Sequence, residues 1–409
     1  MKERKKTITN RLLTTLIVSS AIAGTKPTLA QGLAEALENG TGSADLRLRY
    51  ERVDQDSSLD TASALTLRSR VSYTTGTYRG FSAVVEMEDN RIMLDRGDYT
   101  VPQTNYNTNE FSVILDPEQT ELDQGFLQFQ HGSKTVKFGR QVLTFDNHRF
   151  VGHVGWRQDR QTFDGITFKM SILDNLIMHY GYIEQRNRIV AEATDLSSKD
   201  HLLNLKYQGP SGTLVGYVYL LDVDNGTDNA LDTVGVRYTG TTSADNMKLL
   251  YAAEMAAQTN ENPAFTDDLE TYYVMFEGGM VVKGITAKLG YELLSTDDGQ
   301  VGFATPLATL HKFNGWADIF AVETPATGLV DLKLSLSGTV LGGRWSVSYH
   351  DFQPDEETDA IDDLGSELDL LFAKKFGKLY SAGIKYAAFS AEDQGVDTDK
   401  LWVWFGVSI

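Results

Sequence analysis

The chain has 409 residues, no cysteine, 41% hydrophobic residues and a formal net charge of −19. The lack of cysteine excludes disulfide frameworks, thiolate nucleophiles and cysteine-ligated metals. The negative charge gives no overall attraction to nucleic acid. A chain of this length suggests two or three soluble domains, although one large barrel fits the length equally well.

Residues 1–30 have the pattern of a secretory signal peptide. Basic residues at positions 2, 4, 5, 6 and 11 precede the apolar run LLTTLIVSSAIAG, and Thr28 and Ala30 occupy the small-residue positions of a cleavage site. Cleavage after Ala30 removes six basic residues and one acidic residue, so the formal net charge moves from −19 to −24. No later stretch approaches about 18 uninterrupted apolar residues, so we expect no transmembrane helix.

Short amphipathic β-segments follow from Ala44 to the C-terminus. Most have about ten residues, the length that a tilted strand needs to cross a bilayer. We expect eighteen of them, near residues 44–53, 63–74, 81–89, 121–131, 134–143, 160–171, 175–186, 200–208, 213–223, 232–239, 246–257, 270–278, 283–294, 328–338, 342–352, 365–376, 379–390 and 399–409. An even count lets both termini meet on one side.

The gaps between these segments alternate between short and long. Short gaps read GTYRG, HGSK, GPSG and GTVLGG, and the longest gaps cover 90–120 and 295–327. Short periplasmic turns and long extracellular loops are typical of a barrel in the outer membrane of a Gram-negative bacterium. We therefore predict an all-β fold with three parts: a signal peptide (1–30), a short periplasmic segment (31–43) and an 18-stranded antiparallel transmembrane barrel (44–409).

The polar side of the segments carries charges, as a solvated lumen permits. By alternation, the expected lumen-facing basic residues are Arg47, Arg49, Arg68, Arg70, Lys206, Arg237, Lys248, Lys288, Lys333, Arg344 and Lys385. The expected acidic ones are Asp45, Glu51, Glu86, Glu88, Glu254, Glu292, Glu367 and Asp369. Four of the arginines lie on the first two segments.

A barrel of this size encloses an aqueous interior, so passage of solute is the default function. Clustered arginines select anions because guanidinium groups bind carboxylate and phosphate oxygens in pairs. One hypothesis is therefore a channel for an anionic solute such as a carboxylated sugar polymer or an oligouronate. In the alternative, the arginines pair with Asp45, Glu51 and Glu86 and only brace the wall, and small nutrients diffuse without selection.

A second basic cluster lies in GRQVLTFDNHRFVGHVGWRQDRQTFDG. It contains Arg140, Arg149, Arg157 and Arg160, together with Asp146, Asp159 and Asp164. Alternation puts Arg140 and Asp164 on the outward side. Bulges at Gly139 and Gly165 would turn them inward, and this inward placement is a hypothesis.

Other functions find less support in the sequence. The acidic segments QPDEETDAIDD and DVDNGTDNALD could bind Ca²⁺ or bridge to lipopolysaccharide, or could simply form a solvated surface. No other cofactor or metal is expected. None of the seven histidines lies in a G-x-S-x-G or H-E-x-x-H motif, so we do not expect an enzyme. A barrel hydrolase and a soluble carbohydrate-binding β-protein are the alternatives from other classes.

Four stretches resemble the alginate export family of outer-membrane proteins. They are DLRLRYERVDQD, ALTLRSRVSYTTGTYRGFSAVVEMED, FGRQVLTFDNHRFVGHVGWRQDRQTFDGITF and FATPLATLHKFNGWADIFAVETPATGLVDL. The resemblance covers essentially the whole mature chain. It implies a monomeric 18-stranded barrel with an arginine-lined, electropositive constriction. The expected partners of such a barrel are outer-membrane lipid, lipopolysaccharide and the outer-membrane assembly machinery.

By similarity, the constriction residues are Arg47, Arg49, Arg68, Arg70, Arg140, Arg149 and Arg160. Alternation adds Arg237, Arg344, Glu86 and Glu88 to the predicted pore lining. The stretch HKFNGWADIF, with His311, Trp316 and Asp318, either folds inward as a gate or braces the rim. Ile409 departs from the aromatic residue with which such barrels commonly end.

Overall fold

The computed structural model describes residues 29–409 except positions 191, 228, 245, 262–267 and 322. The segment predicted as a signal peptide lies, up to residue 28, outside the described residues, so cleavage near Ala30 stays a prediction. One α-helix, α1 (Leu29–Glu38), precedes the first strand. No helix in the described part of the chain is long and apolar enough to cross a membrane.

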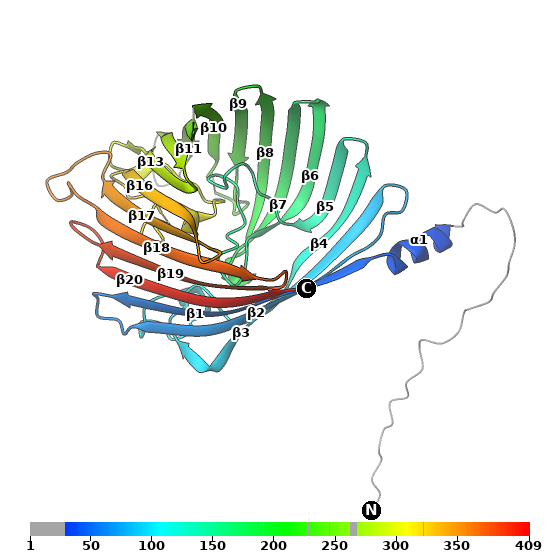
Figure 1. Ribbon diagram of the computed structural model, residues 1–409, viewed down its shortest axis with the longest axis horizontal. Coiled ribbons are helices and arrows are strands. Elements are labelled where there is room, and N and C mark those ends of the chain that lie inside the picture. The colour runs from blue at the N-terminus through cyan, green and yellow to red at the C-terminus, as the bar shows by residue number, and fades with distance from the viewer. Residues whose placement is uncertain (1–28, 191, 228, 245, 262–267, 322) are drawn as a thin grey trace, which may run out of the picture.

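Eighteen strands form one antiparallel sheet that closes on itself, because the last strand pairs with the first. The strands are β1 (Thr41–Gln55), β2 (Ala62–Thr74), β3 (Phe81–Asp98), β4 (Gln119–His131), β5 (Lys134–Gln141), β6 (Thr162–Leu173), β7 (Leu176–Asn187), β8 (Leu196–Gly209), β9 (Gly212–Leu221), β10 (Leu231–Ala244), β11 (Met247–Asn260), β12 (Leu269–Val282), β13 (Ile285–Leu294), β16 (Leu329–Val340), β17 (Gly343–Gln353), β18 (Gly365–Phe376), β19 (Tyr380–Ser390) and β20 (Thr398–Ser408). Figure 1 shows the ring of strands, with the C-terminus and α1 at the same rim.

Each of the eighteen predicted segments corresponds to one strand, and the predicted all-β barrel is confirmed. Several boundaries differ by a few residues, for example the start of β8 and the ends of β10 and β12, and two of the differences have a clear local cause. β1 begins at Thr41 rather than at residue 44, directly after the helix that occupies most of the predicted periplasmic segment. β3 continues past the predicted end at 89, because it loops out around Leu94 and Asp95 and pairs again with β2 at Gly97.

The two faces of the wall differ as the alternation predicts. Large apolar side chains stand on the outside, where lipid replaces water as their surroundings. At mid-strand, for example, Leu334 of β16 is 52% exposed and lies opposite Leu289 of β13, which is 57% exposed. Inward neighbours are polar or charged, and many of them are buried by loops that fill the lumen.

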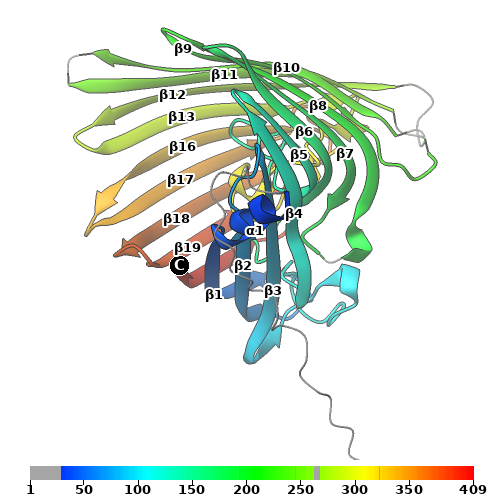
Figure 2. The same cartoon turned by 90° about the vertical axis from the view of Figure 1, so that its right-hand side faces the viewer.

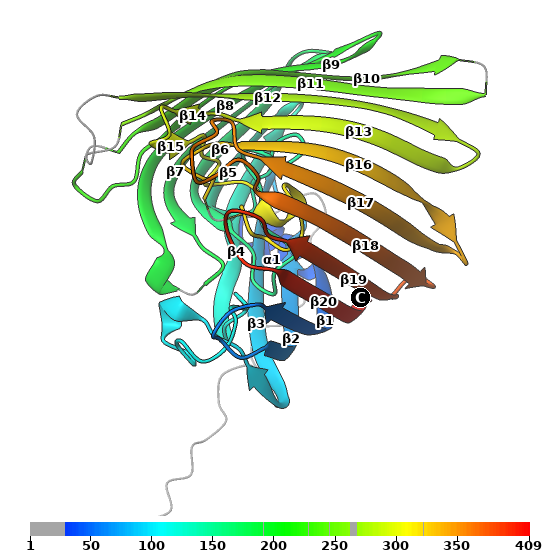
Figure 3. The ribbon, with the colours of Figure 1, turned by 90° about the vertical axis from the view of Figure 1, so that its left-hand side faces the viewer.

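Two loops fold into the barrel and supply its internal packing. Loop L3 (residues 142–161) joins β5 to β6, and loop L7 (residues 295–328) joins β13 to β16. L7 contains the small hairpin β14 (Thr296–Asp297) and β15 (Val301–Gly302) and the 3-10 turn η3 (Leu310–Lys312). Figures 2 and 3 show these segments inside the ring of strands.

The main hydrophobic cluster lies inside the lumen rather than between layers. Phe145 and Val151 of L3, together with Phe303 and Leu307 of L7, pack against the inward faces of the strands. The ring of Phe150 lies 5.0 Å from that of Tyr217 on β9. The aqueous interior that eighteen strands would enclose is therefore narrowed by L3 and L7. Two further 3-10 turns, η1 (Pro102–Thr104) and η2 (Glu192–Thr194), lie in the other outer loops.

Candidate functional site

L3 and L7 bind each other across the lumen. The Gly152 amide donates to the Leu307 carbonyl at 2.7 Å, and the Thr309 amide donates to the His148 carbonyl at 3.0 Å. The ring of Trp156 stacks on that of His311, with centroids 5.1 Å apart and planes at 4°. The two loops therefore form one body, which we call the L3–L7 plug.

Arg157 of L3 fastens the plug to the wall. Its guanidinium donates to Glu51 of β1 at 2.9 Å and to Asp318 of L7 at 3.0 Å, and it lies 4.0 Å from Asp116 of the β3–β4 loop. Burial would lower the pKa of Arg157, but the surrounding carboxylates raise it. The residue is therefore always charged, and it holds three separate segments together.

His311 is a neutral link between L7 and β19. Lys385 Nζ lies 2.6 Å from His311 Nε2 and His311 Nδ1 lies 2.7 Å from Asp318. A lysine ammonium only donates, so Nε2 accepts and Nδ1 carries the hydrogen given to Asp318. Burial and the nearby positive charges lower the pKa of His311 to about 3, against the opposing effect of Asp318. Asp318 itself keeps a lowered pKa despite burial, because basic groups surround it.

Lys385 also lies in an aromatic box made by three tryptophans. Its ammonium is 3.7 Å from the ring centre of Trp316, 4.4 Å from that of Trp156 and 5.4 Å from that of Trp402. The turn before Trp316 needs glycine: Gly315 has φ +84°, and a Cβ there would lie 2.2 Å from Glu367 Oε2. This close approach lets Glu367 accept hydrogen bonds from the amides of Trp316 and Ala317.

Four arginines of the first hairpin, Arg47, Arg49, Arg68 and Arg70, face the lumen, and each contacts a fixed partner. Arg47 Nε donates to Gln158 of L3 at 2.9 Å, and its Nη2 donates to the Trp156 carbonyl at 2.8 Å. Arg49 pairs with Asp116 and Glu51. Arg68 pairs with Asp45, and Arg70 pairs with Glu88. The contacts of Arg47 and Arg49 hold loops against the wall, whereas those of Arg68 and Arg70 join neighbouring strands of the wall.

The second basic cluster separates into inward and outward members. Arg149 of L3 pairs with Glu292 at 2.9 Å and donates to Asn314 at 3.1 Å. Arg160 pairs with Asp123 at 2.6 Å and with Glu86. Arg140, by contrast, lies on the outward side.

The correction for Arg140 follows from the strand register. Its neighbour Gln141 faces the lumen and accepts a hydrogen bond from Thr167 at 2.7 Å, so Arg140 faces the opposite way. There it pairs at 2.8 Å with Asp164, its partner in β6. The ladder between β6 and β7 is irregular at Asp164/Gly165, but this bulge does not turn either side chain inward, and none is found at Gly139.

Basic residues also line the lumen along β5 to β17, between mid-barrel and the short turns. Three are ion-paired there: Lys206 with Asp146, Arg237 with Glu254, and Lys288 with Glu277. Six others make no ion pair with any described residue: Lys137, Lys169, Lys248, Lys312, Lys333 and Arg344. This arc across β5 to β17 carries uncompensated positive charge.

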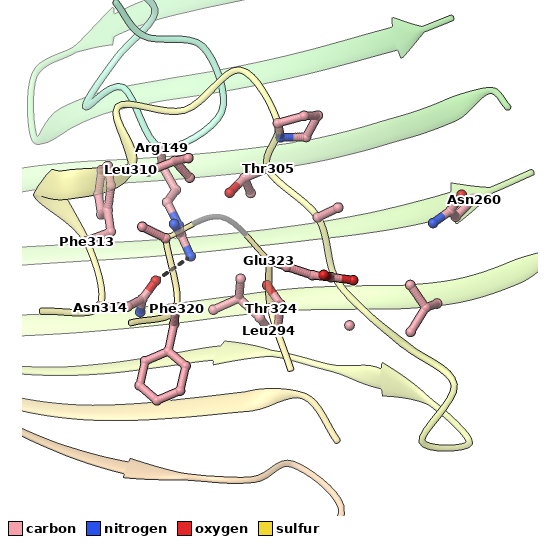
Figure 4. A pocket seen from close by; sticks show the side chains of 15 residues that line it. Arg149, Asn260, Leu294, Thr305, Leu310, Phe313, Asn314, Phe320, Glu323 and Thr324 are labelled. Carbon is pink, nitrogen blue, oxygen red and sulfur yellow. Dashed lines mark hydrogen bonds between the residues drawn. The ribbon is translucent and has the colours of Figure 1, made fainter. Parts of the chain in front are cut away.

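Two cavities meet at the tip of L7. The outer one, of 230 Å³, has an apolar side with Leu310 and Phe320 and a polar side with Arg149, whose bond to Asn314 is dashed in Figure 4. The inner one, of 280 Å³, is lined by the basic residues Arg237, Lys288, Lys312 and Lys333. It is also lined by the carboxylates of Glu277, Glu292 and Asp331, which contact Lys288, Arg149 and His350. Phe313 and Asn314 line both cavities. Burial and then the three neighbouring basic groups lower the pKa of Lys312.

Several of these residues were not found from the sequence. Trp156 and Asp116 lie in loops without periodicity, and nothing local marks them as contacts of Arg49. Lys137 and Lys169 could have been found, because they alternate with the outward-facing Phe138 and Ile166. No group of three or more His, Asp or Glu side chains among the described residues is arranged to hold a metal ion, and Ca²⁺ at the acidic external loops stays a prediction.

A family model described as Alginate export matches residues 41–297, which is more than half of the chain. The chain belongs to the alginate export family. This alginate export protein is thus an outer-membrane channel of a Gram-negative bacterium, and its family is one of porins rather than enzymes. No curated protein matches the sequence.

Solved structures with the same fold include Pseudomonas aeruginosa OccK9 (OpdG), with a TM-score of 0.71 at 15% identity over 91% of this chain and 99% of that chain. Acinetobacter baumannii OccAB4 gives 0.70 at 14% identity over 91% and 98%. Pseudomonas aeruginosa OpdK with vanillate gives 0.71 at 12% identity over 91% and 99%. At these identities the likeness shows the fold of the alginate export protein and not its solute.

Proposed function

We propose that this channel passes anionic, carbohydrate-type solutes such as oligouronates across the outer membrane. The observation that carries the proposal is the inner cavity, where Lys312 and Lys333 have no carboxylate partner among the described residues. An ammonium without a partner is free to bind a solute carboxylate, whereas a paired one must first give up its existing contact.

The solute path runs from the outer cavity past Phe313 and Asn314 into the inner cavity. Apolar side chains in the outer cavity suit the faces of sugar rings, and polar groups such as Arg149 and Thr305 suit hydroxyl and carboxylate groups. OpdK, which shares the fold, has been crystallised with vanillate, a small organic anion. That occupant is a carboxylate and not a sugar, so it supports the anionic part of the proposal alone.

In this proposal one set of basic residues has a structural role and the other attracts the solute. Arg47 and Arg49 bind L3 and hold it in the lumen, whereas Arg68 and Arg70 pair with carboxylates of the strand wall. The arc from Lys137 to Arg344 supplies the attractive field for anions. The closed sheet leaves no free strand edge through which a second chain could pair, and we propose that the channel acts as a monomer.

Block of single-channel current tests the proposal. The mature protein is reconstituted in a planar bilayer, and an oligouronate is compared with a neutral oligosaccharide of the same length. We expect concentration-dependent block by the oligouronate at concentrations where the neutral sugar has little effect. Equal block by both sugars would instead support non-selective diffusion of small nutrients.

A further inference from the structure

A cluster of oxygen atoms is buried where the end of L3 meets β3 and β4. Glu88 lies opposite Glu121 in the ladder between these strands, and Asn90 lies opposite Gln119. Asp159 of L3 contacts both residues of β4: Gln119 Nε2 donates to Asp159 Oδ2, and the carboxyl group of Glu121 contacts that of Asp159. Five oxygen-bearing side chains thus lie in one region, where the end of L3 meets β3 and β4.

Several of these oxygens have no hydrogen-bond donor. Asn90 donates through Nδ2 to the carbonyls of Asp116 and Pro117, at 3.2 and 2.8 Å, which leaves Oδ1 without a partner among the described residues. Gln119 Oε1 and Asp159 Oδ1 also lack a hydrogen-bond partner among the described residues. Asn90 and Asp159 are each only 1% exposed. Native structures rarely leave buried acceptors unsatisfied, so each of these oxygens calls for a partner such as a water molecule or a cation.

The charges around the cluster also do not balance. Five carboxylates gather there: Glu86, Glu88, Glu121, Asp123 and Asp159. Only Arg70 and Arg160 pair with members of this set. The nearby Arg68 and Arg140 are already paired with Asp45 and Asp164. Burial and the neighbouring carboxylates accordingly raise the pKa of Asp159 well above its usual range.

We propose that this cluster binds Ca²⁺ through the carboxylates of Glu121 and Asp159 and the amide oxygens of Asn90 and Gln119. Ca²⁺ takes six to eight oxygen ligands in flexible geometry and accepts carboxylate, amide and water oxygens together. Two of these ligands are carboxylates and two are amides, so the site differs in kind from a cluster of three or more acidic groups. The ion would supply the missing partner for each oxygen, reduce the excess negative charge and fix the end of L3 to β3 and β4.

Titration with Ca²⁺ tests the site directly. The mature protein is extracted from outer membranes into detergent, treated with a chelator and titrated with CaCl₂ in a calorimeter. We expect saturable uptake of one ion per chain and a higher Tm with Ca²⁺ than with the chelator. Asp159→Asn and Glu121→Gln each remove one carboxylate with little change of shape, and both should lose this uptake.

Asp359→Asn is the matched control, because Asp359 lies exposed in the acidic external loop after β17. It should keep the uptake of the wild type, which separates the proposed site from cations held by the outer loops or by lipopolysaccharide. Uptake that is absent in the wild type, or unchanged in Asp159→Asn, overturns the proposal. If a variant fails to fold, the wild-type Tm decides: a Tm that responds to pH but not to Ca²⁺ assigns the cluster to a shared proton and overturns the site.

Discussion

Arg157→Gln removes the cation that joins the plug to the wall. The side chain is 5% exposed and contacts Glu51 and Asp318, so its loss leaves two buried carboxylates without their shared partner. Removing one partner of a buried ion pair typically costs about 3–5 kcal/mol. We expect the effect in the local opening of the plug rather than in barrel assembly, because no strand hydrogen bond depends on Arg157.

The remaining contacts put the cost at the lower end of that range. Glu51 keeps Arg49 at 3.0 Å, while Asp318 keeps His311 at 2.7 Å and Lys400 at 3.5 Å. A cost of about 3 kcal/mol corresponds to roughly a hundredfold rise in the ratio of open to closed plug. Arg157→Lys retains the charge but reaches fewer acceptors. Its ratio of open to closed plug should therefore lie between those of the wild type and Arg157→Gln.

Single-channel recording at fixed voltage measures this ratio as the frequency and duration of high-conductance events. Lys199→Gln is the control, because it breaks only the solvent-exposed pair with Asp224, which water and salt screen. Heat-modifiable mobility on gels checks that each variant still forms the barrel. If Arg157→Gln fluctuated no more than the wild type, the plug would not depend on this ion pair and the reasoning would be wrong.

Three further predictions address the solute, the pH and the lipid face. Lys312→Gln with Lys333→Gln should weaken block by an oligouronate, whereas Lys374→Gln on the outward face should not; an equal effect of both would refute the role of the inner cavity. The folded state holds the proton of His311 more weakly than the unfolded state, whose pKa is about 6.5, so the plug is most stable above that pH and weakens as pH falls toward 3. High-conductance events should therefore increase between pH 6.5 and 4 and should change less with pH in His311→Gln; a flat profile in the wild type would contradict this. Leu334→Arg puts a charge at mid-strand against lipid and should cost about 2–4 kcal/mol in urea unfolding from vesicles, and a cost near zero would argue against the assigned faces.

The alternation of apolar and polar residues predicted the strands of the barrel, because one face of each strand contacts lipid and the other faces the polar lumen. A residue such as Leu48 faces lipid and its neighbours Arg47 and Arg49 face the lumen, and this requirement repeats in every strand. The eighteen strands and the inward side of all the basic residues assigned by alternation could therefore be read from single segments. Arg140 was assigned from the resemblance against its own alternation, and the alternation gave the correct side.

The plug could not be predicted in this way. Its contacts join residues more than a hundred positions apart, such as Arg157 with Asp318 and Trp156 with His311, and no local pattern specifies which loop enters the lumen. The two possible roles of the first four arginines also depended on where L3 would lie. Only the structure shows that Arg47 binds the backbone of that loop, and that lysines of the opposite wall keep their charge unpaired.

The reversal potential across a planar bilayer with a KCl gradient tests the central claim most directly. An excess of unpaired basic residues in the turn-side half of the lumen predicts a potential of the sign that marks preference for Cl⁻ over K⁺. Replacement of Lys312 and Lys333 by glutamine should move that potential toward zero. A reversal potential that marks cation preference in the wild type would contradict the account.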